Sequence, residues 1–135
     1  MTDQPPYLER LRTSGLRLTA PRTKIAQILF EDAAARHVTA DWIADELAST
    51  GTHVAIGTIY NTLRLFLDQG WLREVRGTAG SAAIFDTNLR PHHHIYDEVT
   101  GKLSDIAELD LDISGEIKPP KGKSITGFDI VIRVR

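Results

Sequence analysis

An amphipathic helix that runs directly into two short strands constrains the fold more than any other feature of the sequence. The segment IGTIYNTLRLFLDQG (56–70) places apolar residues on one stripe, and Gly70 suits a helix end because glycine adopts the left-handed conformation without strain. Residues 71–76 and 82–86 have the composition of short strands, and glycines interrupt the run between them. The expected inward stripe of the helix is Ile56, Ile59, Leu63, Phe66 and Leu67. The sequence therefore predicts a helix followed by a β-hairpin.

Three more helices are predicted ahead of this one. The first covers about residues 7–15, and the second begins after Thr19, whose side chain can cap it, with Pro21 in its first turn. The third begins after Thr39 and ends at Gly51. The residues of the third helix that are expected to face inward are Trp42, Ile43 and Leu47.

Helices followed by a hairpin form the layout of a winged helix-turn-helix, in which the helix ahead of the hairpin enters the major groove of DNA. Residues 1–86 are therefore predicted to form a winged-helix DNA-binding domain. The face of the last helix that lies opposite its apolar stripe would meet the DNA. That face carries Thr58, Asn61, Thr62 and Arg64.

A polar connection at residues 87–91 ends in proline and is the predicted hinge to a second domain, residues 92–135. This domain is predicted to contain a strand at 92–97, a turn at Thr100 and Gly101, a strand at 102–106, a short helical or looped region, and a last strand in FDIVIRVR. So small a unit rarely buries enough apolar surface alone, so we expect dimerisation, helped by a metal. The predicted fold class is α+β, a winged helix-turn-helix domain followed by a small α/β dimerisation domain.

The composition narrows the kinds of site and partner that the chain can have. Cysteine is absent, which excludes disulfides and thiolate zinc sites and leaves nitrogen and oxygen atoms as metal ligands. No apolar run reaches the roughly 18 residues of a membrane helix, and the N-terminus lacks the pattern of a signal peptide, so we expect a cytoplasmic protein without a membrane partner. Residues 1–24 hold 5 basic and 2 acidic groups, whereas residues 91–135 hold 6 basic and 8 acidic groups. This asymmetry predicts different partners for the two ends.

Three of the five histidines stand together at 92–94. On a strand, His92 and His94 face the same side, roughly 7 Å apart along the backbone, and can converge on one cation, whereas His93 faces the other side. Asp86 offers a carboxylate nearby in the sequence, and His37 could join from the first domain. The alternative is that the three histidines only solvate the edge of a strand, and that His37 is a surface residue ahead of a helix.

Taken together, these motifs resemble the ferric uptake regulator family of metal-responsive repressors. The resemblance extends from Gly15 to the final strand, and the segments that carry it are LRLTAPRTKI, HVTADWIADEL, VAIGTIYNTLRLFLDQGWL, AIFDTN and HHHIYDEVTGKLSDI. FDTN followed by HHHIY is similar to the iron response regulator branch of alphaproteobacteria. The resemblance implies a homodimeric, DNA-binding transcriptional regulator of iron or metal homeostasis genes.

The resemblance also implies where metals would bind. The sensory metal site of the family would fall on His37, Asp86, His92 and His94. A second site of the family would fall on Pro91, His93, Asp112 and Phe128. Only His93 and Asp112 of the second set can ligate, so an ion there would be held weakly. Where most members have a Cys-x-x-Cys pair for structural zinc, this chain has Asp97 and Thr100, so that zinc site is absent.

The identity of the sensed ligand stays open at this stage. Zinc, iron(II) and manganese(II) all accept nitrogen and oxygen ligands. Some members of the iron response regulator branch carry a Cys-Pro haem-binding motif, which this chain lacks. If haem binds, only the histidine cluster could supply its axial ligands.

For DNA we expect Tyr60 and Asn61 in the groove, with Thr58 and Thr62 beside them. Asn61 stands where many members have arginine, and asparagine pairs with adenine whereas arginine prefers guanine. Ala55 replaces the usual serine cap of this helix. The arginines expected to contact phosphates are Arg17, Arg22, Arg73 and Arg76.

Two other functions compete with this interpretation. A small metallohydrolase could use the histidines and Asp86 to hold a catalytic zinc, but the sequence contains no HExxH, phosphate loop or nucleophile motif, so we expect no enzyme activity. A member of the family that dimerises and binds DNA without sensing metal is the other alternative.

Overall fold

A computed structural model describes residues 6–32, 34, 36–78, 80, 82–107 and 110–135. The chain divides into two compact units. The first comprises Met1–Val75 with Ala82–Leu89, and the second comprises Arg76–Ser81 with Arg90–Arg135. Among the described residues, no helix has the length and apolar character needed to cross a membrane. The predicted domain limits of 1–86, 87–91 and 92–135 stay a prediction.

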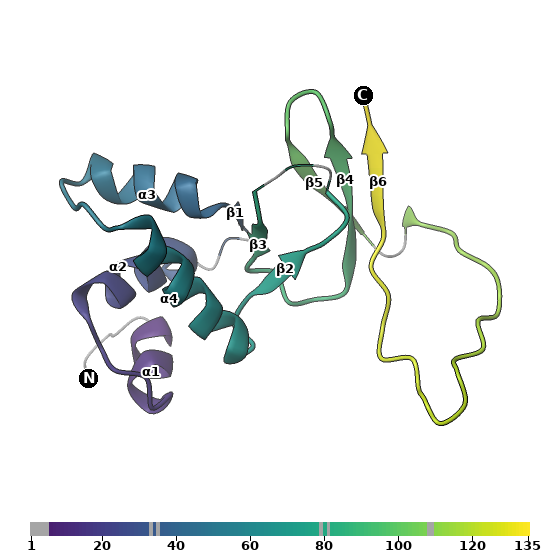
Figure 1. Ribbon diagram of the computed structural model, residues 1–135, viewed down its shortest axis with the longest axis horizontal. Coiled ribbons are helices and arrows are strands. Elements are labelled where there is room, and N and C mark those ends of the chain that lie inside the picture. The colour runs from purple at the N-terminus through teal and green to yellow at the C-terminus, as the bar shows by residue number, and fades with distance from the viewer. Residues whose placement is uncertain (1–5, 33, 35, 79, 81, 108–109) are drawn as a thin grey trace. The chain divides into compact units, whose positions relative to one another are not determined.

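Four helices form most of the first unit, and two of them begin at the predicted caps (Figure 1). The helices are α1 (Pro6–Thr13), α2 (Ala20–Phe30), α3 (Ala40–Ser49) and α4 (Ile56–Asp68). The Thr19 hydroxyl oxygen accepts a hydrogen bond from Arg22 N (3.3 Å), and that of Thr39 accepts one from Trp42 N (3.1 Å). Both bonds satisfy amide groups that have no partner within their helix. Ala55 leaves α4 without a side-chain cap, as its lack of a side-chain oxygen predicts.

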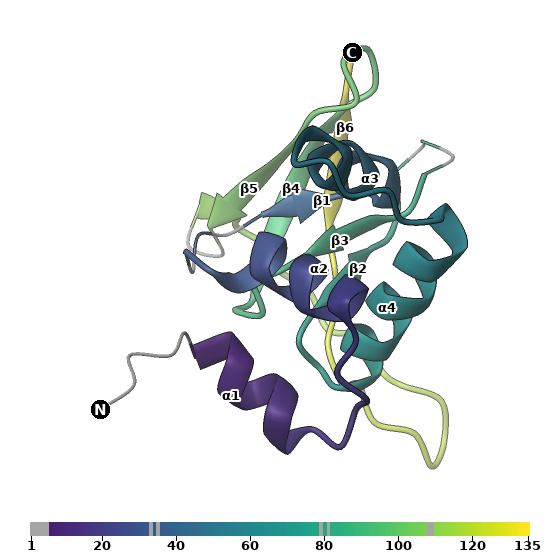
Figure 2. The same ribbon diagram turned by 90° about the vertical axis from the view of Figure 1, so that its left-hand side faces the viewer.

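The predicted hairpin is present, and a third strand joins it (Figure 2). Strands β2 (Arg73–Val75) and β3 (Ile84–Asp86) pair antiparallel, and β1 (His37–Val38) pairs antiparallel with the other edge of β3. Strand β1 was not predicted from the sequence, because a strand of two residues has no periodicity to detect. Val38 joins the buried core of the unit, which includes Ile25, Leu29, Ile43, Leu47, Ile59, Leu63 and Phe66.

Three side chains lie differently from their predicted positions. Thr62, expected on the outer face of α4, is buried at 1% exposure, because it lies three residues after Ile59 and four before Phe66, on the stripe that faces the core. Its hydroxyl donates to Thr58 O (2.9 Å), which removes the cost of burying it. Trp42 and Ile56, expected to face inward, are exposed at 36% and 44%. Both lie in the first turn of a helix, where fewer neighbouring elements can cover them.

The second unit contains one three-stranded sheet. Strands β4 (His92–Asp97) and β5 (Leu103–Ala107) pair antiparallel, and β6 (Val131–Val134) pairs parallel with β4 on its other edge. The first two strands are where the sequence predicts them. The last one is shorter than FDIVIRVR, and residues 111–130 ahead of it form neither helix nor strand.

The capping bond at the start of α3 leads to a prediction about stability. Thr39→Ala removes the acceptor for Trp42 N, so we expect the free energy of unfolding to fall by about 1 kcal/mol. Chemical denaturation followed by circular dichroism measures this change. Thr39→Ser keeps the oxygen and should stay close to the unsubstituted protein. Equal losses in both variants would mean that the methyl group, and not the cap, is what matters.

Candidate metal centre

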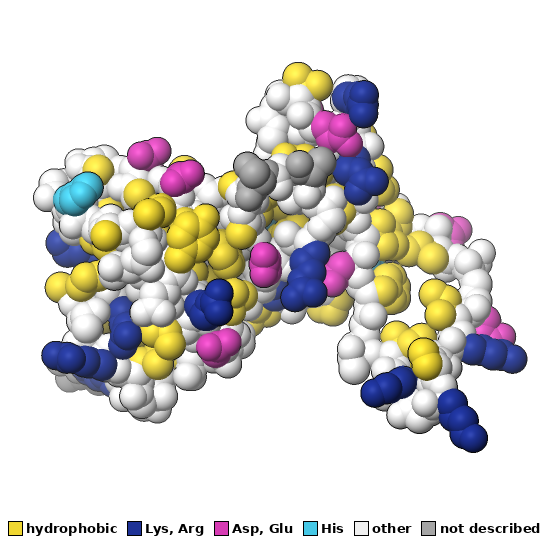
Figure 3. Space-filling model, viewed as in Figure 1, with side chains coloured by type: hydrophobic (Ala, Val, Ile, Leu, Met, Phe, Trp, Pro, Cys, Tyr) yellow, Lys and Arg dark blue, Asp and Glu magenta, His cyan; other side chains and the backbone are white. Residues whose placement is uncertain are grey.

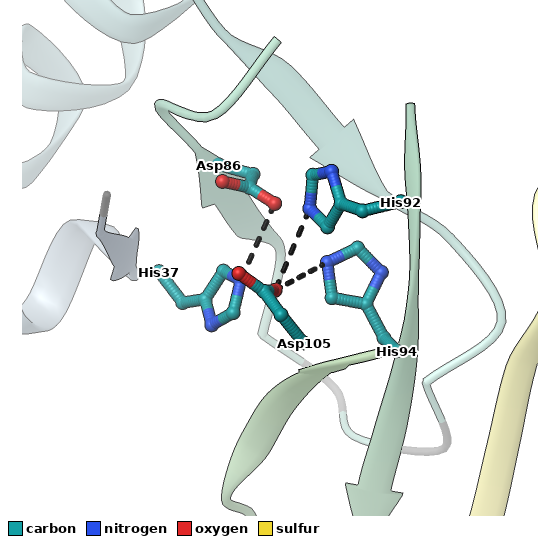
Figure 4. A group of neighbouring side chains, drawn as sticks. All are labelled: His37, Asp86, His92, His94 and Asp105. Carbon is teal, nitrogen blue, oxygen red and sulfur yellow. Dashed lines mark ion pairs between the residues drawn. The ribbon is translucent and has the colours of Figure 1, made fainter. Parts of the chain in front are cut away.

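One ligand group lies entirely in the first unit. His37 on β1 stands opposite Asp86 on β3 in the strand register, and His37 Nε2 lies 3.2 Å from Asp86 Oδ2 (Figure 4). The carboxylate of Asp86 is buried at 1% exposure, and its other oxygen accepts a hydrogen bond from Asn88 N (2.8 Å). Two hydrogen bonds between Arg36 and Thr87 continue the pairing beyond the two-residue strand: Thr87 N donates to Arg36 O (3.1 Å), and Arg36 N donates to the Thr87 hydroxyl oxygen (2.9 Å). We call His37 and Asp86 the first ligand group.

A second ligand group lies entirely in the second unit. His92 and His94 alternate on β4 with ring centroids 4.5 Å apart, and Asp105 Oδ1 lies 3.4 and 3.3 Å from their Nε2 atoms (Figure 4). His92 Nδ1 lies 2.5 Å from the carbonyl oxygen of Arg90. Because a carbonyl can only accept, this contact fits the tautomer that carries its proton on Nδ1, in which Nε2 has the lone pair that a cation would bind. We call His92, His94 and Asp105 the second ligand group.

Asp105 was not among the predicted site residues. It stands directly opposite His94 in the β4–β5 ladder. The predicted turn at residues 100 and 101 contained the signal, because a hairpin turn sets the register of the two strands that it joins. A two-residue turn at 100 and 101 would place residue 105 across from residue 96, on the face of β4 that carries both imidazoles. The actual turn spans residues 98–101 and is closed by Asp97 N donating to Lys102 O (2.9 Å), which places residue 105 across from residue 94 on that same face.

The atoms in both groups are suitable for a divalent cation. Neutral imidazole nitrogen and carboxylate oxygen bind zinc, and iron(II) and manganese(II) also accept this donor set. Each ligand group offers atoms of this kind: the first has one imidazole and one carboxylate, and the second has two imidazoles and one carboxylate.

His93 has a different role from the neighbouring histidines. Its ring stacks on Phe128, with centroids 5.5 Å apart and planes 19° from parallel, and its Nδ1 accepts a hydrogen bond from Ile130 N (3.3 Å). These contacts attach the chain ahead of β6 to β4. Among the described residues, neither His93 nor Asp112 belongs to a group of three or more metal-ligating side chains. The weaker second site stays a prediction.

The turn between β4 and β5 is held by hydrogen bonds to side chains. Asp97 Oδ1 accepts from Val99 N (2.8 Å) and Thr100 N (3.1 Å), and Thr100 Oγ1 accepts from Lys102 N (3.2 Å). The bonds from Thr100 N and Val99 N hold the pKa of the Asp97 carboxyl below its usual value. Asp97 and Thr100 stand where the resemblance places the zinc-binding cysteine pair of most family members. In this chain the two residues order the turn through these hydrogen bonds instead.

The predicted DNA-contact residues differ in accessibility. Thr58, Tyr60 and Asn61 are exposed on α4, whereas the burial of Thr62 removes it from the surface that DNA could reach. Arg22 Nη1 donates to the carbonyl oxygen of Arg17 (2.7 Å), which holds the two residues together at the start of α2. Arg17 and Arg76 are exposed, and Arg73 is half-buried on β2.

Comparison with known proteins identifies the family of the chain. The model of the ferric uptake regulator family matches residues 13–132. The chain belongs to this family. It is 35% identical over 121 residues to the peroxide-responsive repressor PerR of Staphylococcus epidermidis, covering 89% of this chain and 75% of that protein. It is 38% identical to PerR of Staphylococcus aureus (strain Mu50), covering 89% of this chain and 76% of that protein.

Solved structures show the same fold. The ferric uptake regulator of Pseudomonas aeruginosa, solved with manganese, has a TM-score of 0.71 at 24% identity and covers 96% of this chain and 97% of its own. The Vibrio cholerae ferric uptake regulator has a TM-score of 0.71 at 18% identity and covers 94% of this chain and 97% of its own. The predicted α+β fold class is therefore confirmed.

Membership in this family also decides the broad class of function. The chain is a DNA-binding transcriptional regulator of the ferric uptake regulator family, and the prediction that it is not an enzyme is confirmed. The metallohydrolase alternative is thereby removed. The narrower assignment to the iron response regulator branch stays a prediction.

The turn at Asp97 predicts a dependence of stability on pH. Because folding lowers the pKa of this carboxyl, its ionised form stabilises the fold above the unfolded pKa of about 3.9, and that contribution is lost as the pH falls through the lower folded value. Denaturant titrations between about pH 2 and pH 6 should therefore show a flatter pH dependence for Asp97→Asn than for the unsubstituted protein. Asp32→Asn removes a second carboxyl whose pKa folding lowers, through its bond from Ala34 N, and should flatten the dependence in the same direction. An unchanged slope in Asp97→Asn would show that the turn does not depend on the charge.

Proposed function

We propose that this regulator senses a divalent cation, which the first and second ligand groups bind together. The observation that supports the proposal most directly is the second ligand group, where Asp105 Oδ1 on β5 lies within 3.4 Å of the Nε2 atoms of two imidazoles on the adjacent strand β4. His37 and Asp86 add a nitrogen and an oxygen from the winged-helix unit. Five side chains from both units exceed the four ligands of a typical structural zinc site, and they leave no need for a cysteine.

The donor set narrows the choice of cation without deciding it. Intrinsic affinity favours zinc over iron(II) and manganese(II), so the available metal in the cell would decide between them. Two related structures were solved with such ions, the Pseudomonas aeruginosa regulator with manganese and a zinc-bound manganese uptake regulator. Haem is the alternative ligand, and His92 or His94 would then supply an axial nitrogen.

The shared ligand set would link metal binding to DNA binding. We propose that the chain acts as a homodimer in the cytoplasm, on double-stranded operator DNA of iron or metal homeostasis genes. The two recognition helices of a dimer must match half-sites about one helical turn apart, so the angle between the two units decides whether both can bind. His37 and Asp86 restrict that angle when they share a ligand with the second group. The coupling is reciprocal, so operator DNA must change the affinity for the metal by the same factor.

The DNA contacts that we propose lie on two surfaces of the winged-helix fold. Tyr60 and Asn61, with Thr58 beside them, read the major groove from the exposed face of α4. The proposed phosphate contacts are Arg17, Arg22, Arg73 and Arg76. Thr62, which the sequence analysis included, supports α4 from within the core instead.

The metal-sensing proposal is tested by removing two ligands of the second group. In the His92→Ala/His94→Ala variant, a divalent cation should no longer change operator affinity, whereas in the unsubstituted protein one of manganese, iron(II) or zinc should change it at least tenfold, about 1.4 kcal/mol. Fluorescence anisotropy of a labelled duplex at constant salt, with protein stripped of metal, measures both. Asp105→Ala should weaken metal binding in the same direction, as measured by isothermal titration calorimetry.

His53→Ala is the matched control, because His53 is an exposed histidine outside both ligand groups. It should leave metal binding and coupling unchanged. Tight operator binding that ignores every cation and haem in the unsubstituted protein would instead support the metal-insensitive alternative.

Base preference at Asn61 gives an independent test of the recognition helix. Asparagine pairs with the N6 and N7 edge of adenine, so Asn61→Arg should move the preferred base at one operator position from adenine to guanine. Each change of base should alter the affinity by about 1–3 kcal/mol. The shift is measured by selecting binding sequences from a random duplex library with the unsubstituted protein and with Asn61→Arg, and by sequencing both selected pools. Identical selected sequences would place Asn61 away from the bases.

A further inference from the structure

A basic turn interrupts the otherwise acidic second unit. Residues 117–127 hold Lys118, Lys121 and Lys123 and contain no Asp or Glu. Of the 6 basic and 8 acidic groups in residues 91–135, three basic groups lie in this segment, which leaves three basic against eight acidic groups elsewhere. The unit therefore has an acidic body and one concentrated site of positive charge.

The local backbone orders this segment although it belongs to neither a helix nor a strand. Lys123 N donates to Pro120 O (2.9 Å), and Gly122 has a φ of 79°, which is the pattern of a type II turn with glycine at its third position. Pro119 and Pro120 restrict the backbone ahead of the turn. Because the turn is already formed, binding a partner would cost little backbone entropy.

The three lysines are exposed and have no acidic partner among the described residues. In the part of the chain that the structure describes, no acidic group forms an ion pair with these lysines within 4.0 Å. By contrast, Arg133 and Arg135 both approach Glu98, at 3.6 Å and 3.3 Å. In the space-filling view, dark-blue side chains stand out on the loop that the ribbon of Figure 1 draws in yellow-green ahead of β6 (Figure 3). The positive charge of this turn is therefore available to an external partner.

The neighbouring residues indicate what kind of polyanion would fit. Ser124 and Thr126 add hydroxyl donors, and a Cβ placed on Gly122 or Gly127 would meet no atom within 4 Å, so a strand of phosphates could approach the backbone closely. Lysine, serine and threonine side chains and backbone amides are common donors to the phosphates of duplex DNA. The aromatic residue next to the segment, Phe128, already stacks on His93 with one face of its ring (centroids 5.5 Å apart), which argues against a stacking platform for single strands.

We infer that this lysine turn (residues 117–127) is a second, sequence-independent DNA contact, which binds the phosphates of duplex DNA outside the recognition helix. The inference rests on the proposed DNA-binding function of the winged-helix unit. Each phosphate that a lysine neutralises releases condensed counterions, so the lysine turn would increase the salt dependence of binding without changing base preference.

The test is the slope of log affinity against log salt concentration for a labelled operator duplex. Lys118→Ala/Lys121→Ala/Lys123→Ala should reduce the magnitude of this slope by about 2–3, since each lost phosphate contact contributes about 0.9. The corresponding triple arginine variant should keep the slope. Lys102→Ala, which removes an exposed lysine from the β4–β5 turn of the same unit, should reduce it by less than Lys121→Ala does.

The outcomes separate this inference from the proposed function. If the unsubstituted protein binds the operator and the triple alanine variant has the same slope and affinity, the inference is wrong while the proposed function stands. If no duplex binds the unsubstituted protein, both are wrong. Vesicles of phosphatidylserine and phosphatidylcholine form a parallel arm. Loss of vesicle binding in the triple alanine variant with an unchanged DNA slope would assign the turn to a lipid surface and overturn the DNA contact.

Discussion

Antiparallel strand register is the constraint on which both ligand groups depend. His37 meets Asp86 because β1 pairs with β3, and His94 meets Asp105 because β4 pairs with β5. A slip of one residue in either ladder would turn one partner to the opposite face of its sheet. The positions of the ligand atoms in each unit therefore depend on backbone hydrogen bonds between strands, one of which has only two residues.

Such short strands need support from their surroundings. Val38, the second residue of β1, is buried at 2% exposure in the core that α2, α3 and α4 share, and this burial holds His37 at the edge of the sheet. Asp86 is the buried partner, and an ionised carboxylate in that position is costly unless hydrogen bonds or a cation compensate it. Its contacts to Asn88 N and His37 compensate part of this cost, and a bound cation would compensate more. The core of the winged-helix unit thus determines where the first ligand group, His37 and Asp86, can lie.

The sequence predicted those parts of the fold that depend on local signals. The Thr19 and Thr39 caps, the hairpin and the β4–β5 strands each have a signature within a few residues. Thr62 was predicted on the outer face of α4 because its side chain is polar, and this was wrong. Its position on the stripe between Ile59 and Phe66 buries it.

The missed features depend on contacts between distant residues. The β1–β3 pair joins residues some fifty positions apart, and no local pattern in a two-residue strand reports its partner. Asp105 was predictable in principle from the hairpin register, whereas the resemblance alone did not point to it. The prediction of His37, Asp86, His92 and His94 as a common site relied on the resemblance, and their joint binding of one cation stays a proposal.

The second unit is predicted to lack the structural zinc site of its family, and the structure shows weaker sources of stability at the corresponding turn. A structural zinc ion can contribute about 10 kcal/mol or more to folding, whereas a net hydrogen bond contributes about 1 kcal/mol. Asp97 and Thr100 supply three such bonds at the β4–β5 turn, and His93 with Phe128 supplies a ring stack beside β6. These contacts do not cover Ile132 and Val134, which remain 39% and 42% exposed on β6. A sheet this small with apolar residues exposed at its edge gains the most from a second copy of the chain, which supports the proposed homodimer on energetic grounds.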